Sequence, residues 1–104
     1  MSKLHLVLST HWDREWYQTF QQFRFRLVDL MDRVLDQLST GELACPFTLD
    51  GQVIPIEDYL EIRPEKKELI HSLVKKEKLE VGPWFVMPDI WAVSGESLIR
   101  NLEL

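Results

Sequence analysis

The chain of 104 residues has only one cysteine, Cys45, so no disulfide can form within it. It has no long apolar run either, and the opening MSKLHLVL is shorter than a signal peptide or a membrane span requires. Lys and Arg number 12 against 17 Asp and Glu, a formal charge of −5 with no sustained basic cluster. Because a phosphate backbone is bound through basic side chains, this composition argues against nucleic acid as a partner. We expect a cytoplasmic chain that binds neither nucleic acid nor membrane.

Apolar residues are plentiful, and their spacing changes along the chain. They make up 45% of the sequence, enough for one core of ordinary size. Leu4 to Leu8 is almost continuously apolar, which is typical of a parallel strand buried on both faces, although His5 interrupts it. From Phe20 to Leu38 the apolar residues step by three, four or one, which predicts a helix that ends at Gly41.

The same alternation continues to the end of the sequence. A short run over 46–49 is closed by Asp50-Gly51, and Leu79 to Met87 indicates another strand, which Gly82-Pro83 bends or places at an edge. Between them lie the stretch 54–62 and, after Pro64, a helical segment with Leu69, Ile70, Leu73 and Val74. Ser94-Gly95-Glu96 opens a last helix. Strands alternating with helices predict an α/β fold with a parallel sheet.

Acidic residues follow each predicted strand: Asp13, Asp50 and Asp89. In parallel α/β folds the carboxyl ends of the strands line one rim, where ligands bind. Residues two apart in extended backbone point to the same side, so His11 and Asp13 can offer an imidazole nitrogen and a carboxylate oxygen to one divalent ion. Zinc accepts that mixture, and His11 and Asp13 are therefore candidate metal ligands.

Each of these residues also has an ordinary structural explanation. Asp13 is a suitable N-cap for the following helix, Asp50-Gly51 is a common turn pair, and Asp89 after Pro88 suits a loop. Three other residues have similar explanations: His5 as a core histidine, His71 as a surface histidine and Trp16 as a partly buried residue that staples the long helix. Spacing alone does not decide between a metal site and local structure.

Three longer segments carry a resemblance: THWDREWY, FTLDGQVIPIEDYLEIRPE and VGPWFVMPDIWAVSGESLIRNL. Together, in this order, they resemble the amino-terminal part of glycoside hydrolase family 38, the α-mannosidases, particularly the bacterial branch. The resemblance covers nearly the whole chain. It implies a retaining, metal-dependent hydrolase of α-mannosides whose first domain is a seven-stranded β/α-barrel-like fold of the glycoside hydrolase/deacetylase type, followed by helical and β-sandwich domains. Residues 1–104 would be part of that barrel.

The resemblance also implies roles for particular residues. His11 and Asp13 match the first two metal ligands of the family, whose metal is usually zinc, and Trp16 matches the aromatic residue that stacks on the bound sugar. Asp89 falls near the active-site rim as a substrate-binding candidate, and Asp50 is a candidate to support the ligands. The family nucleophile and its last metal histidine lie beyond Leu104. We therefore expect that the 104-residue chain is a fragment without activity. The resemblance implies that the intact enzyme cleaves mannose-containing substrates, and it allows a homo-oligomer.

Some features depart from the family pattern or favour other classes. Ile90 and Trp91 follow Asp89 where polar or acidic residues are common in the family, and Met87 stands where a polar residue is frequent. With an open sheet edge, we also expect Phe85, Ile90 and Trp91 to form an exposed patch and the chain to be unstable or to self-associate. One rival class is a metal-dependent polysaccharide deacetylase. Another is a non-catalytic sugar-binding module that uses Trp16, Trp84 and Trp91.

Overall fold

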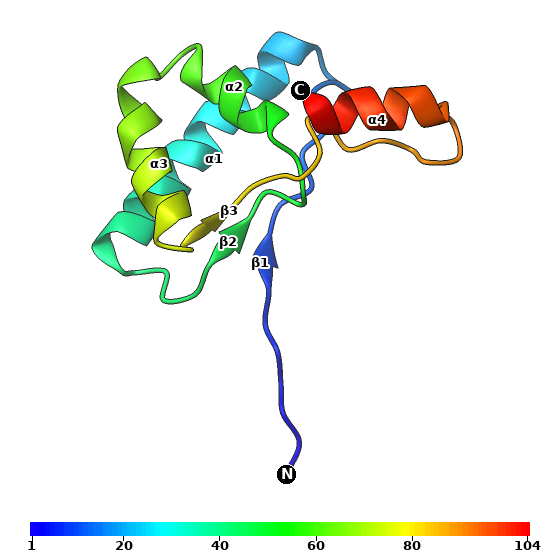
Figure 1. The fold of residues 1–104 in the computed structure, drawn as a ribbon. Helices are drawn as coiled ribbons and strands as arrows, with labels where there is room; N and C mark the ends of the chain where they lie inside the picture. Colours follow the sequence, from blue (N-terminus) through cyan, green and yellow to red (C-terminus); the bar gives the residue numbers. More distant parts are fainter.

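The computed structural model describes residues 1–104 as an α/β unit built around three short parallel strands (Figure 1). Strands β1 (Leu8–Ser9), β2 (Phe47–Thr48) and β3 (Leu79–Glu80) pair side by side in the order β1-β2-β3. The register places Leu8 beside Phe47 and Phe47 beside Leu79. The predicted parallel sheet is confirmed.

Helices connect the strands, as the alternation predicts. Helix α1 (Phe20–Thr40) joins β1 to β2, whereas α2 (Ile54–Leu60), the short 3-10 helix η1 (Pro64–Lys66) and α3 (Lys67–Lys75) join β2 to β3. Helix α4 (Gly95–Glu103) follows β3 after a long loop and stands to one side of the body (Figure 1). No helix combines the length and the apolar composition that crossing a bilayer requires.

Local sequence explains where α1 begins and ends. The Thr19 hydroxyl accepts a hydrogen bond from the Gln22 backbone, and the Gln22 side chain accepts one from the Thr19 N–H, which together form a capping box. The helix ends at Gly41, whose φ of 81° is the left-handed conformation that glycine adopts without steric cost. The hypothesis that Asp13 caps this helix is therefore wrong, because Thr19 holds that position.

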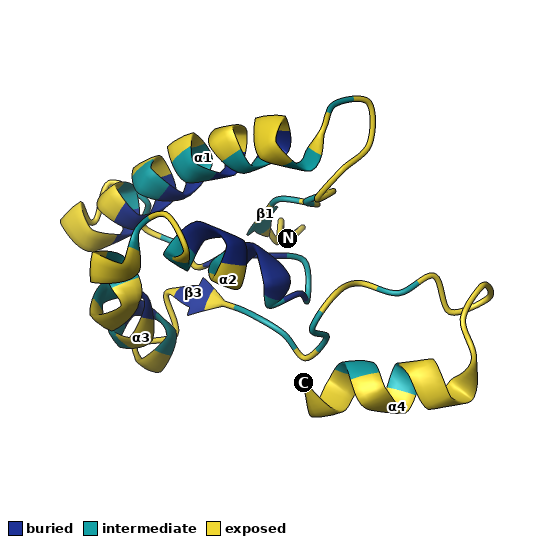
Figure 2. Cartoon of the chain, turned by 90° about the horizontal axis from the view of Figure 1, so that it is seen from above, coloured by how far each residue is buried: buried dark blue, intermediate teal, exposed yellow.

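The core lies between α1, the sheet and the helices α2 and α3 (Figure 2). Its buried residues come from every one of these elements, and each aliphatic side chain removed from water contributes about 1.5–3 kcal/mol. Eleven residues form it: Leu27, Met31, Val34, Leu35, Leu38, Phe47, Leu49, Tyr59, Ile70, Leu73 and Leu79. The apolar stripe predicted for the long helix supplies five of them.

A polar network at the edge of this core joins α1 to α2 and to the residues just after it. The hydroxyl of Tyr59, which is fully buried, donates to Asp32 Oδ1 at 2.7 Å, and Arg63 Nη2 donates to Asp32 Oδ2 at 3.2 Å. Burial by itself would raise the pKa of Asp32, but the hydrogen bonds from Tyr59 and Arg63 outweigh burial and hold the pKa below its usual value. Burial and the bond to Asp32 raise the pKa of Tyr59.

The first strand is shorter and more exposed than its apolar sequence predicts. Only Leu8 and Ser9 pair with β2, while the side chains of Leu4, Leu6 and Val7 are 94%, 72% and 73% exposed. These residues extend past the end of the two-residue β2 as an arm that no layer of the 104 residues covers (Figure 1). The expectation of a strand buried on both faces is wrong here, and His5, on this arm, is exposed rather than a core histidine.

The third strand is also shorter than predicted. It ends at Glu80, and the chain turns at Gly82, with φ 70°, so the stretch up to Met87 is loop. Trp84 returns to the sheet edge in an isolated parallel bridge with Gln52. His71 lies on the surface, as predicted.

Helix α4 begins as predicted but buries no residue (Figure 2). The Ser94 hydroxyl caps it by accepting from the Ser97 N–H at 3.1 Å. Asn101 ties it to the preceding loop, because its side chain donates to the Val86 carbonyl at 2.7 Å and accepts from the Val86 N–H at 3.1 Å. Ile90 and Trp91 are 60% and 97% exposed, which confirms that part of the expected patch, whereas Phe85 is half-buried.

The network at Asp32 predicts a specific dependence of stability on pH. Asp32→Asn should lower the free energy of unfolding by about 1 kcal/mol near neutral pH, a value discounted because the carboxylate is 35% exposed. Since folding lowers this pKa, the contribution is present above the ordinary value of 3.8 and is lost as pH falls through the folded value. Urea titrations should show the difference between wild type and variant shrinking as the pH falls below 3.8. A difference that does not shrink on acidification would contradict this account.

Candidate functional site

The segments that follow β1 and β2 meet at the carboxyl edge of the sheet. The register pairs Ser9 with Thr48, so the residues two positions further along, His11 and Asp50, come side by side. The Thr10 N–H extends the pairing by donating to the Thr48 carbonyl at 3.3 Å. The rim predicted from the strand ends is therefore formed by these two segments.

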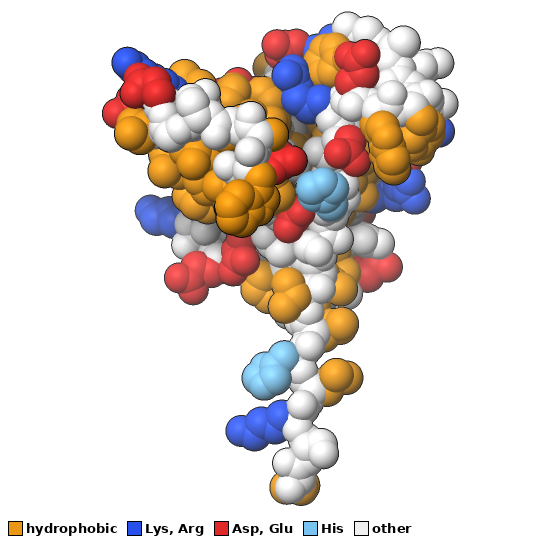
Figure 3. Space-filling model, turned by 90° about the vertical axis from the view of Figure 1, so that its right-hand side faces the viewer, with side chains coloured by type: hydrophobic (Ala, Val, Ile, Leu, Met, Phe, Trp, Pro, Cys, Tyr) orange, Lys and Arg blue, Asp and Glu red, His pale blue; other side chains and the backbone are white.

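A pocket of about 270 Å³ opens at this rim, lined by His11, Trp12, Asp13, Arg14, Glu15, Gln52, Val86 and Met87. Figure 3 shows this face, with a histidine among acidic side chains above the extended N-terminal arm. Hollows of about 360 and 400 Å³ lie along α1 around Phe25, but neither is lined by a histidine or a carboxylate. Side chains able to hold a metal or move a proton gather at the smaller pocket.

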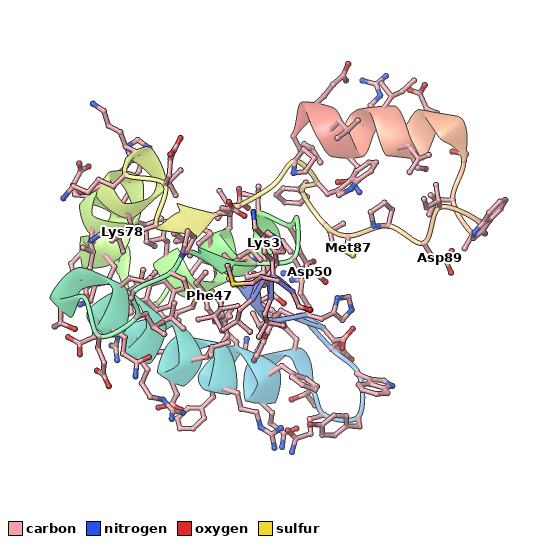
Figure 4. All side chains as sticks on the ribbon, turned by 90° about the horizontal axis from the view of Figure 1, so that it is seen from below. Lys3, Phe47, Asp50, Lys78, Met87 and Asp89 are labelled. Atoms are coloured by element: carbon pink, nitrogen blue, oxygen red, sulfur yellow. The ribbon has the colours of Figure 1, made fainter.

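His11 is oriented by Asp50. The two side chains approach at 2.6 Å between Nδ1 and Oδ2, so the imidazole donates its Nδ1–H to the carboxylate and keeps the Nε2 lone pair free. Asp50 has φ 54° and Gly51 has φ 79°, two successive left-handed residues at the end of β2. This turn brings the Asp50 carboxylate to the imidazole. Figure 4 shows Asp50 at the edge of the strands.

Asp13 lies on the free side of the imidazole. Its Oδ1 is 3.7 Å from His11 Nε2, and the two side chains are 45% and 58% exposed. Tetrahedral zinc bound at about 2.1 Å holds two such donors about 3.4 Å apart, so the pair suits one ion after a small side-chain movement. No set of three or more His, Cys, Asp or Glu side chains in the chain has metal-binding geometry. The donors fit zinc in kind, but they fall short of the three protein ligands of a catalytic zinc site.

The structure does not bring Trp16 and Asp89 to the imidazole. Trp16 is 74% exposed, so it does not staple the helix, and it packs edge-on against Tyr17 with ring centroids 5.4 Å apart. Asp89 Oδ1 accepts from the Trp91 N–H at 3.1 Å and closes a turn of its own loop, as its loop interpretation predicts. Figure 4 shows Asp89 on the loop that leads to α4, away from Asp50. Thr48 pairs with Glu80, which places Gly82 rather than an acid beside Asp50.

Arg14 fixes the loop that carries these residues. Its Nε and Nη2 donate to both oxygens of Asp58, at 2.7 and 2.9 Å, and its guanidinium lies 4.8 Å from the centre of the Phe20 ring. Asp58 belongs to α2 and its side chain is 5% exposed. The hydrogen bond to Asp58 raises the pKa of Arg14 above its usual value. The sequence gives little sign of this clamp, since Asp58 stands beside another acid, Glu57, in PIEDYL and its partner is 44 residues away.

Gln52 is a second residue of the site that no sequence pattern predicts. It is 2% exposed, its Nε2 donates to the Trp12 carbonyl at 2.9 Å, and its Oε1 accepts from the Met87 N–H at 3.3 Å. The side chain thus connects the segments after β1 and β3. No pattern in the sequence marks it, because both of its partners are backbone groups far away in the chain.

Comparison with known proteins agrees with this fold. The family model described as glycosyl hydrolases family 38 N-terminal domain matches residues 1–104. The chain belongs to glycosyl hydrolase family 38. It is 41% identical over 98 residues to a putative mannosylglycerate hydrolase from Halalkalibacterium halodurans, an alignment that covers 94% of this chain and 11% of that protein.

Two solved structures from Enterococcus faecalis are similar to the chain. One is an alpha-mannosidase with 43% identity and a TM-score of 0.87, and the other is a protein in glycosyl hydrolase family 38 with 38% identity and a TM-score of 0.80. Each alignment covers 92% of this chain and 11% of the other chain. The chain therefore corresponds to about a ninth of the length of these relatives, and its α/β arrangement is that of their matched portion.

The Arg14 clamp predicts an unequal effect of two arginine substitutions. Arg14→Met leaves the buried Asp58 carboxylate without its partner and should lower the free energy of unfolding by about 2–3 kcal/mol. The control is Arg33→Met, which removes an exposed pair with Asp29 and should cost less than about 0.5 kcal/mol. Urea unfolding of both variants measures the difference. Equal losses would show that the clamp does not hold the loop.

Proposed function

We propose that this chain is the amino-terminal part of a retaining, metal-dependent α-mannosidase that removes terminal α-D-mannosyl residues. The observation that carries the proposal is the arrangement around His11. Its Nε2 faces the Asp13 carboxylate, while its Nδ1 is bound to Asp50. Membership in glycosyl hydrolase family 38 and the alpha-mannosidase title of the Enterococcus faecalis structure support it. The metal-dependent deacetylase and the sugar-binding module have no such support.

The residues present suit part of a zinc site. His11 Nε2 and the Asp13 carboxylate would hold the ion, which when bound supplies a Lewis acid and a template for sugar hydroxyls. Asp50 keeps the proton on Nδ1, so that Nε2 can act as a ligand. The exposed Trp16 ring offers an apolar face on which a sugar can stack, and Asp89 offers a carboxylate further along the rim.

The remaining groups would come from a longer polypeptide. Retaining hydrolysis requires a nucleophilic carboxylate and a carboxylic acid about 5 Å apart. We assign no residue of the pocket to either role. Exposed large apolar side chains support the proposal of a longer polypeptide, since Leu4 is 94% and Trp91 is 97% exposed. We propose that further strands of a β/α barrel, followed by helical and β-sandwich domains, cover these surfaces in the intact enzyme.

A second candidate substrate follows from the Halalkalibacterium halodurans relative. Its name, putative mannosylglycerate hydrolase, favours a small mannoside with an acidic aglycone. Comparing the release of mannose from mannosylglycerate and from an aryl α-mannoside by the complete polypeptide distinguishes the two.

The proposal predicts a sharp effect of His11. In the complete polypeptide supplied with zinc, His11→Ala should lower kcat/KM for an aryl α-mannoside by about 100-fold or more and should reduce bound zinc, whereas Asp50→Asn should lower activity by about 10- to 100-fold. His71→Ala, which changes an exposed histidine on α3, is the matched control and should leave both unchanged. If wild type released no mannose, or if His11→Ala were as active as wild type, the proposal would fail.

A further inference from the structure

We propose that Gln52 is a positioning residue that sets the width of the pocket between the metal-ligand segment 11–13 and the segment 86–87 on the opposite side. The inference rests on the proposed function, because it assigns Gln52 to the same site. Gln52 binds neither metal nor sugar in this account. It acts by holding two stretches of backbone.

The geometry of the side-chain amide carries the proposal. Its Nε2 donates to the Trp12 carbonyl at 2.9 Å and its Oε1 accepts from the Met87 N–H at 3.3 Å. Trp12 stands between His11 and Asp13, and its carbonyl lies in the peptide unit that leads directly to Asp13, so holding this carbonyl restrains the backbone beside both ligands. Met87 belongs to the opposite wall of the pocket. One side chain therefore spans the distance from wall to wall.

Backbone pairing anchors Gln52 itself. The Trp84 N–H donates to the Gly51 carbonyl at 2.9 Å, and the Val53 N–H donates to the Trp84 carbonyl at 2.9 Å. A Cβ added at Gly51 would stand 3.7 Å from Met87 Cε and 3.8 Å from Trp84 Cδ1, which shows that the two segments are already packed together. Because its backbone is held on both sides, the reach of the Gln52 amide is fixed.

Only an amide of this length satisfies both partners. One partner is a carbonyl, which needs a donor, and the other is an N–H, which needs an acceptor. Glutamate would place a carboxylate oxygen against the Trp12 carbonyl, methionine would leave both backbone groups without this partner, and asparagine is one methylene shorter. With the side chain 98% removed from solvent, water cannot readily take the place of either bond.

The test uses the complete polypeptide with Gln52→Met and Gln52→Glu, which preserve side-chain length, and Gln21→Met on the exposed face of α1 as the matched control. Zinc affinity is measured by competition with a chromophoric chelator, and kcat/KM for an aryl α-mannoside is measured at saturating zinc, well below the melting temperature of each variant. Gln52→Met should weaken zinc binding and lower kcat/KM by about tenfold or more, as loss of groups that orient ligands does in metal sites. Gln52→Glu should lower both further, and Gln21→Met should change neither.

The outcomes separate this inference from the proposed function. If Gln52→Met only lowers the melting temperature and the folded enzyme keeps zinc affinity and kcat/KM within about twofold of wild type, Gln52 is structural and the inference is wrong. The same conclusion follows if Gln52→Glu is as active as wild type. If wild type itself neither binds zinc nor releases mannose, the proposed function fails as well. Active wild type with impaired Gln52 variants and an unaffected Gln21→Met supports both.

Discussion

The hydrogen bond between His11 and Asp50 joins the ends of two neighbouring parallel strands, and the candidate site depends on it. It arises from register, because Ser9 pairs with Thr48 and each acid or imidazole lies two residues further on. Parallel strands end at the same edge, so a residue pair that is 39 positions apart in sequence becomes adjacent in space. The contact also selects the imidazole tautomer. With Nδ1–H directed at a carboxylate, Nε2 faces outward beside Asp13.

The residues of the site lie on irregular backbone, so hydrogen bonds to the buried side chains of Asp58 and Gln52 supply the rigidity. Arg14 ties the loop after β1 to Asp58 on α2, and Gln52 ties the same loop to the segment after β3. The Asp58 carboxylate and the Gln52 amide both have hydrogen-bond partners in places that little water reaches, where an unpaired group would be costly. His11, by contrast, stays exposed to ligands. The hydrogen bonds of Arg14 and Gln52 thus hold the backbone in place while His11 stays accessible. A metal or substrate site needs both.

Sequence patterns could predict the order of strands and helices, the apolar stripe of α1 and the meeting of His11, Asp13 and Asp50, because each follows from periodicity or from parallel strand ends. The same patterns predicted a longer first and third strand than the structure has. Apolar composition does not reveal whether a neighbour exists to pair with, so Leu4 was expected in a sheet that extends only to Leu8. They could not predict Gln52 or Arg14, since both depend on distant partners. The prediction that Asp89 lies at the rim beside Asp50 does not hold in this structure. The register places Gly82 beside Asp50, and Asp89 stands seven residues further along the chain.

The central claim is that Asp50 directs His11 so that Nε2 is free to bind a metal. A long-range ¹H–¹⁵N spectrum of the imidazoles in the metal-free protein tests it most directly, recorded near about pH 8, where an ordinary histidine is neutral. The account predicts that His11 carries its proton on Nδ1 and that Asp50→Asn shifts the population toward the Nε2–H tautomer, while His71 is unaffected. A wild-type His11 with its proton on Nε2 would contradict it.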